Sequence, residues 1–260
     1  MRKRFWWVTF ALLAFSITVI GWKADDRLVI PRNIPAKTAG ASAKMFFSSY
    51  IEKIYHTAQL NDAGLEFPVF QKAVTGYFNL KASAKVSQYS SVITVIDLAK
   101  SSCTKRMWII DMVNKNLILN TWVAHGNGSG DIIPDHFSNE NYSHASSLGF
   151  YVTDNVYNGK HGRSLRLDGL DSGFNDNAFI RGIVIHAAPY VSSYVINLKG
   201  RIGRSEGCPA ISPKVARKVI NTIKGKTVIF ISGNDDSYSS KYLDERIAAN
   251  YVYPVNGDNQ

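Results

Sequence analysis

The sequence predicts a mainly β domain with a few helices, and three observations support this prediction. Hydrophobic residues make up 45% of the 260-residue chain, which is enough to bury a full core. Short segments rich in β-branched residues recur between residues 91 and 233. Apolar residues at helical spacing occur ahead of them, between residues 47 and 78. We therefore expect one main globular domain with appended segments.

Two helices are predicted ahead of the strands. Apolar side chains recur at helical spacing from Phe47 to Ala58, and again after Pro68 as far as Phe78. A membrane-surface role for these helices is an alternative, but aromatic stripes belong more often to a core. We expect residues 43–90 to form a helical segment packed on the domain.

The main domain, residues 91–233, contains five predicted strands and one predicted helix. The strands are expected at residues 91–98, 106–112, 117–126, 182–188 and 226–233, with a hairpin turn at 113–116. The helix is expected from Ser212 as N-cap, through Pro213 in its first turn, to Gly225. Residues 126–181, rich in Gly, Ser and Asn, predict long loops, and residues 234–260 predict a polar, weakly structured tail.

The N-terminus has the pattern of an export signal. Three basic residues in MRKR precede an uncharged run of 18 residues, 5–22. The run predicts a signal peptide or a signal-anchor, since it would rise about 27 Å as a helix against a bilayer core of about 30 Å. The flank GWKADD offers no clear cleavage site, which favours an uncleaved anchor over residues 1–22. Residues 23–42, rich in Pro, Ala and charge, predict a linker.

Charge and orientation indicate where the protein works. Basic residues before the apolar run predict that the remainder is exported to the periplasm or cell envelope. The formal net charge of +10 favours contact with anionic surfaces such as cell-wall polymers or lipid headgroups. Because no basic run interleaved with aromatic residues occurs, we do not expect a nucleic-acid partner.

The segment GRSEGCPAIS, residues 203–212, contains Cys208, one of two cysteines in the chain. A cysteine nucleophile reacts as the thiolate, which needs a base, a cation or a helix N-terminus nearby. Arg204 and the helix predicted after Ser212 would meet two of these needs. His125 and His186 both end predicted strands, and His186 is the stronger candidate base because it precedes Cys208 by only 22 residues.

An acyl-transfer site also needs donors for an oxyanion. Pro209 has no backbone N–H, so the amides of Gly207 and Cys208 remain as candidates. Gly207 would also let a substrate approach the backbone closely.

Three other interpretations stay open on the residues alone. Cys208 could be a small buried hydrophobe, as free cysteines often are. A Cys103–Cys208 disulfide in an exported protein would make the segment structural and the domain a non-catalytic wall-binding module. Asp131, Asp135 and His136, with His125, lie close enough in sequence to suggest a metal site, although no recognised ligand spacing occurs.

The segment IVIHAAPYVSSYVINLKGRIGRSEGCPAI resembles the active-site segment of the L,D-transpeptidase catalytic-domain (YkuD-like) family. That family has a His, a spacer, then Ser or Thr, a variable position, Gly and Cys. The stretches TVIDLAKSSCTKRMWIIDM, VAHGNGSG, SHASSLGFY and HGRSLRLDGLDSGFNDNAFIRGIVIH are also similar to the murein L,D-transpeptidase branch. The resemblance covers roughly residues 45–232 and implies a β-sandwich-like fold with the cysteine in a groove.

The resemblance implies a reaction and its residues. Cys208 would attack a carbonyl of a peptidoglycan stem tetrapeptide after deprotonation by His186, and the amides of Gly207 and Cys208 would hold the oxyanion. An amine acceptor would then give a cross-link, whereas water would give L,D-carboxypeptidase activity. We expect neither a cofactor nor a metal.

The sequence departs from the commonest family pattern at two positions. Glu206 stands where a His usually precedes the glycine, and Ala210 stands where a basic or amide residue often follows the cysteine. We expect Glu206 to point away from the thiol, because a carboxylate facing it would raise the thiol pKa, or to hold a substrate amine. Arg204, and Ser205 beside it, are the candidate substrate-binding residues.

Overall fold

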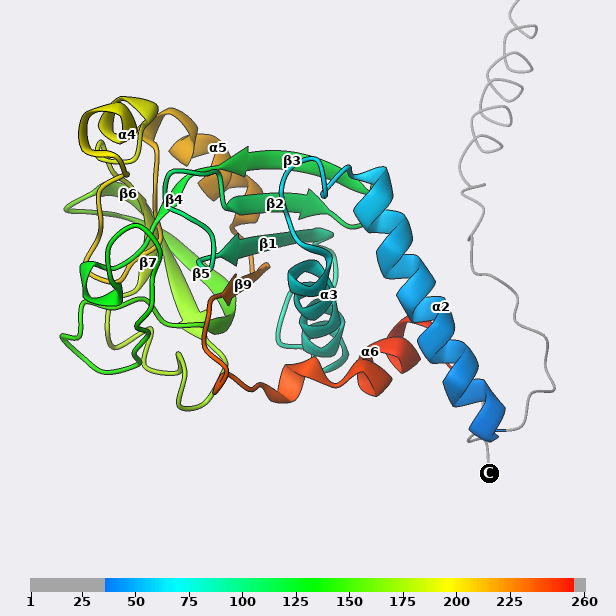
Figure 1. Cartoon of the computed structure of the whole chain (residues 1–260). Coiled ribbons are helices and arrows are strands. Elements are labelled where there is room, and N and C mark those ends of the chain that lie inside the picture. Colours follow the sequence, from blue (N-terminus) through cyan, green and yellow to red (C-terminus); the bar gives the residue numbers. More distant parts are fainter. Residues whose placement is uncertain (1–35, 255–260) are drawn as a thin grey trace, which may run out of the picture. The chain divides into compact units, whose positions relative to one another are not determined.

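The computed structural model describes residues 36–254, with side chains described from residue 41, and Figure 1 shows their arrangement. The predicted signal or anchor segment, residues 5–22, lies outside these residues and stays a prediction. Within the described part of the chain, no helix is both long and apolar enough to cross a membrane.

Nine strands form one sheet with the order β3-β2-β1-β9-β5-β6-β7-β8-β4. Their bounds are β1 Val92–Asp97, β2 Met107–Asp111, β3 Asn116–Thr121, β4 Val123–Ala124, β5 Gly149–Gly159, β6 Gly162–Gly169, β7 Val184–Ala187, β8 Ala210–Ile211 and β9 Val228–Ser232. The two ends of this order, β3 and β4, are separated in the chain by Trp122 alone. The sheet therefore curls until its edges are joined through that residue, which confirms the mainly β fold.

Alternation along the central strands fills a core on each face of the sheet. In β2, Trp108 and Ile110 enter one hydrophobic cluster, whereas Met107 and Ile109 enter the other. Successive side chains of a strand point to opposite faces, so this pattern requires both faces to be covered. The strands are consequently apolar throughout rather than alternately polar.

Helices cover the two faces from different parts of the chain. Helices α2 (Ala36–Thr57), α3 (Phe67–Ala82) and α6 (Glu245–Val252) pack together on the face that contains Trp108 (Figure 1). Helix α5 (Pro213–Ile223) buries Ala216, Val219, Ile220 and Ile223 on the other face. The predicted helices at 47–58, after Pro68 and after Ser212 are confirmed.

Two predictions about irregular segments are wrong. Residues 149–169, expected as loop, form the long β5–β6 hairpin, which a bulge between Thr153 and Val156 interrupts. The bulge breaks the period-2 pattern, and the outer half of the hairpin is polar and exposed, so the strand pattern is absent from these residues. The tail expected to be weakly structured contains α6, which Asp244 caps by accepting hydrogen bonds from the amides of Arg246 and Ile247.

The predicted linker is also shorter than expected. Helix α2 begins at Ala36, inside the segment 23–42. Alanines recur from residue 36 to residue 43, and alanine is the strongest helix former, so helix propensity extends upstream of the apolar stripe.

Candidate active site

Strands β7 and β8 lie side by side and join the segments that carry His186 and Cys208. The strands are parallel, and His186 pairs with Ala210. Cys208 precedes Ala210 by two residues, so it lies level with Val184, two residues before His186. Residues two apart on a strand share a face. The Cys208 Sγ atom accordingly lies 3.7 Å from the carbonyl oxygen of Gly182.

The His186 ring is held by the backbone. Its Nδ1 atom lies 3.0 Å from the carbonyl oxygen of Ala187, and a carbonyl can only accept, so Nδ1 carries the proton. The Nε2 atom is then the unprotonated nitrogen, as a general base requires. Burial lowers the pKa of His186. The hydrogen bond to the Ala187 carbonyl opposes that effect, and the nearby His161 and Lys160 add smaller decreases. His186 is therefore neutral at pH 7.

The turn that carries Cys208 is organised by the hydroxyl of Ser205. The buried Oγ atom donates to the carbonyl oxygen of Cys208 at 2.6 Å and accepts from the amide of Gly207 at 3.2 Å. The Ser205 backbone is bound on both sides, because its amide donates to His125 and its carbonyl accepts from Asn127. Ser205 thus supports the turn from inside.

The backbone conformation at position 207 and the close packing around it both require glycine. Its φ of +111° is a conformation that L side chains rarely adopt. A Cβ atom there would also lie 2.9 Å from the carbonyl oxygen of Ala145 and 3.3 Å from Nη2 of Arg181. Either restriction alone would disfavour another residue.

Arg181 supports the loop that lies against this turn. Its guanidinium donates to the carbonyl oxygens of Ser138 and Ala145, and to the hydroxyls of Ser143 and Ser147. The half-buried cation thereby fixes the loop on which Gly207 rests. Sequence reasoning missed Arg181, because an arginine inside a Gly- and Asn-rich segment carries no periodic signal.

The electrostatics of Cys208 differ from the sequence prediction. Burial raises the pKa of the Cys208 thiol, and the Val184 amide, Arg181 and Lys160 oppose that effect. Glu206 is exposed, as expected, and its effect on the Cys208 pKa is a small increase.

The predicted substrate-binding residues are engaged inside the protein. Arg204 donates from Nη1 to the carbonyl oxygen of Gly130 at 2.7 Å and lies 3.5 Å from a carboxylate oxygen of Asp131. Ser205 is buried, with its hydroxyl used in the turn. A substrate carboxylate would have to compete with Asp131 for Arg204.

The disulfide interpretation is wrong, because Cys103 and Cys208 are both free thiols. The Cys103 Sγ atom lies 2.9 Å from the carbonyl oxygen of Gly200. The side chains suggested for a metal site do not gather either, since the described residues contain no group of three suitable ligands.

His125, the weaker candidate base, has a structural role. Its ring is buried, and Nδ1 accepts a hydrogen bond of 2.7 Å from Nη2 of the buried Arg106. Burial and the Arg106 charge lower the pKa of His125 to about 4. The ring therefore stays neutral beneath the Ser205 turn.

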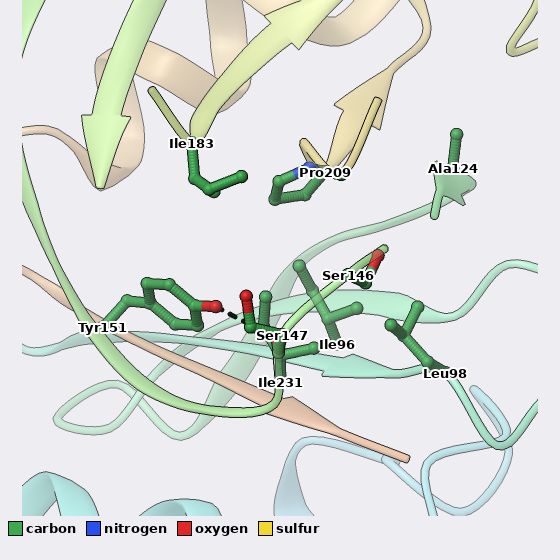
Figure 2. Close-up of a pocket in the computed structure, with 10 residues that line it drawn as sticks. Ile96, Leu98, Ala124, Ser146, Ser147, Tyr151, Ile183, Pro209 and Ile231 are labelled. Carbon is green, nitrogen blue, oxygen red and sulfur yellow. Dashed lines mark hydrogen bonds between the residues drawn. The ribbon is translucent and has the colours of Figure 1, made fainter. Parts of the chain in front are cut away.

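A small pocket lies beside the turn that carries Cys208 (Figure 2). Gly207 and Pro209, the two neighbours of Cys208, line it together with Ile183. Opposite them lie Ser147 and Tyr151, whose hydroxyl donates to the Ser147 carbonyl oxygen at 2.9 Å. The Cys208 thiol contacts the carbonyl oxygen of Gly182, just ahead of strand β7.

Replacing Ser205 with alanine should weaken both the turn and any activity that depends on it. The change leaves the Cys208 carbonyl and the Gly207 amide without their partner, which costs about 1–3 kcal/mol of stability. We expect a lower Tm and an activity loss of about tenfold, from a misplaced nucleophile. Ser205→Thr keeps the hydroxyl and should retain most activity. Equal activity in all three proteins would contradict this role.

Fold and site together define a class of protein: a curled sheet with a half-buried cysteine and a neutral, backbone-oriented histidine on the segments that its parallel β7–β8 pair joins. The chain belongs to the L,D-transpeptidase catalytic domain family, whose profile matches residues 61–232. The family expected from the resemblance is thus confirmed. No curated protein sequence matches the chain.

Several solved structures are similar to this chain at low identity. An L,D-transpeptidase from Mycobacterium smegmatis shares 13% identity over 55% of this chain and 59% of its own, with a TM-score of 0.33. The L,D-transpeptidase from Stackebrandtia nassauensis shares 14% over 62% and 67%, with a TM-score of 0.34. The helical cell shape determining protein from Campylobacter jejuni shares 13% over 69% and 62%, with a TM-score of 0.40. The chain spans less than two thirds of the Mycobacterium smegmatis protein.

Proposed function

We propose that the protein is a cysteine-dependent L,D-transpeptidase that acts on peptidoglycan stem peptides. The observation that supports this proposal most directly is the parallel β7–β8 pairing, which joins the two segments that carry His186 and Cys208, together with the proton on His186 Nδ1 that leaves Nε2 unprotonated. Family membership supplies the substrate class.

The resting pair is neutral in this proposal. The pKa of His186 is lowered and that of Cys208 is raised, so both shifts disfavour a preformed thiolate–imidazolium pair. His186 must therefore take the thiol proton as the sulfur attacks the substrate carbonyl, which makes it a general base in the acylation step. Arg181 and Lys160 favour the thiolate character that develops on Cys208.

Two amides are available for the oxyanion of the tetrahedral intermediate. Among residues 36–254, no acceptor takes the Cys208 amide N–H, so it is ready to donate. The Gly207 amide donates to Ser205 across a long 3.2 Å bond, and it would turn from Ser205 to a more strongly charged oxygen.

Collapse of the intermediate breaks the peptide bond and leaves a thioester on Cys208. The leaving amine of D-alanine takes the proton that His186 carries, which returns the ring to its neutral form. An acceptor amine then attacks the thioester, gives its proton to His186 and forms the new amide, while the sulfur leaves and regains its proton. Attack by water instead gives an L,D-carboxypeptidase, the second candidate.

The place of action is part of the proposal. The basic residues ahead of the apolar run 5–22 support export to the periplasm or cell envelope, with membrane anchoring through that run. Stem peptides of the wall would then lie within reach of the domain.

Incubating the full chain with purified muropeptides tests the reaction. Disaccharide tetrapeptides should yield cross-linked dimers together with free D-alanine, detected by mass spectrometry. Tripeptide monomers without dimers would assign the carboxypeptidase instead. If the tetrapeptides remain unchanged, the proposed function is wrong.

A further inference from the structure

The β5–β6 hairpin ends directly over the base. Gly159 pairs with Gly162, so Lys160 and His161 are the two residues of its turn. Strand β6 continues into the pairing of Leu165 with Ile185 on β7, which carries the turn toward the end of β7 where His186 lies. The imidazole rings of His161 and His186 stack, with centroids 4.2 Å apart and planes 23° apart.

The stack completes the enclosure of the His186 ring. His161 is exposed, whereas His186 is only 3% exposed. The Ala187 carbonyl fixes the rotation of the His186 ring through Nδ1, and the His161 ring covers one of its faces. A side chain enclosed in this way keeps Nε2 in one direction and keeps water off the ring.

Charged side chains near His186 and Cys208 change the pKa of each. Lys160 and His161 of the turn act on His186, and both lower its pKa after the larger effect of burial. Lys160 also acts on Cys208, together with Arg181 and Glu206. The hairpin turn is thus electrostatically connected to both members of the Cys–His pair.

We propose that His161 is a positioning residue for the base: its ring stacks on His186, holds Nε2 toward the thiol and shields the ring from water. This inference rests on the proposed function of His186. The exposed hairpin turn thereby takes part in the reaction through His161.

The test compares His161→Ala with His161→Phe in the full chain. We expect His161→Ala to lower kcat about 10- to 100-fold with little change in KM, since the base loses its fixed position. Water then reaches His186, so the acidic limb of the pH–rate profile should move toward higher pH. Phenylalanine keeps the stack and should restore most of the rate. Equal rates for His161→Phe and His161→Ala would overturn the proposal.

Two controls isolate the effect. His56→Ala removes an exposed histidine from helix α2 and should leave rate and profile unchanged. Thermal unfolding should show the same Tm for every variant, because the turn is exposed. An effect of His56→Ala as large as that of His161→Ala would count against a specific role.

A titration of His186 by NMR makes the outcome independent of catalysis. Its pKa should rise in His161→Ala and rise less in His161→Phe. If it does so in a protein that leaves muropeptides unchanged, the positioning role stands and the proposed function fails. If the His186 titration is the same in all three proteins, the positioning role fails, whatever the activity.

Discussion

Replacing Cys208 with alanine should abolish turnover while the fold stays intact. The thiol is the nucleophile of the proposed reaction, so we expect a loss on the order of 10⁴-fold or more. Alanine removes one atom from a half-buried position and keeps the turn, since the hydrogen bonds of the turn use the Cys208 carbonyl and the Ser205 hydroxyl. Mass spectrometry of the intact wild-type protein should show an acyl adduct that Cys208→Ala lacks.

Cys103 provides the matched control for this experiment. It is the other free thiol, and it contacts the Gly200 carbonyl rather than the histidine. Cys103→Ala should keep both the turnover and the adduct. If Cys208→Ala remained active, or if the adduct mapped to Cys103, the assignment of the nucleophile would be wrong.

The elements that sequence patterns predicted well are those whose side chains face one uniform environment. Helix α5 has a buried apolar face and an exposed basic face, and Ser212 and Pro213 mark its start. Strands β1, β2 and β9 are buried on both faces, so they read as continuous apolar runs. Such signals are local and survive without any knowledge of the tertiary structure.

The wrong predictions concern elements whose structure depends on tertiary contacts. The outer half of the β5–β6 hairpin is stabilised by backbone pairing and projects toward the site, so it needs no apolar alternation. Helix α6 buries only Ala248 and Ala249 fully, a contact too small to stand out in a polar sequence. In both cases the partner surface, which the sequence does not display, determines the structure.

Some residues of the site were also suggested by the sequence, whereas others depend on the tertiary structure. The spacing of His186 and Cys208 suggested the proposed pair, and the family resemblance selected it among the alternatives. The orienting Ala187 carbonyl is a backbone atom, and His161 reaches the pair only through the hairpin. The direction of the Cys208 pKa shift was also missed, because burial outweighs the cations and depends on the packed structure.

Replacing His186 with glutamine should cause the second largest loss of catalytic rate. Loss of a general base typically costs 10²- to 10⁴-fold, and we expect about 10³-fold here. Glutamine is similar in size and can still hydrogen-bond, so the Tm should change little. A variant as active as wild type would show that the thiol is deprotonated by another group.

The pH dependence of the two proteins then tests the neutral resting pair. In wild type, activity should fall as pH drops through the His186 pKa, which lies below 6.5, because protonation removes the base. In His186→Gln no base remains, and thiolate forms only as pH rises toward a Cys208 pKa above 9.0. The residual rate of the variant should therefore climb steadily into alkaline solution, which steady-state rates between pH 5 and 10 would measure. An acidic limb above pH 6.5 in wild type, or a flat profile in the variant, would instead indicate a preformed ion pair.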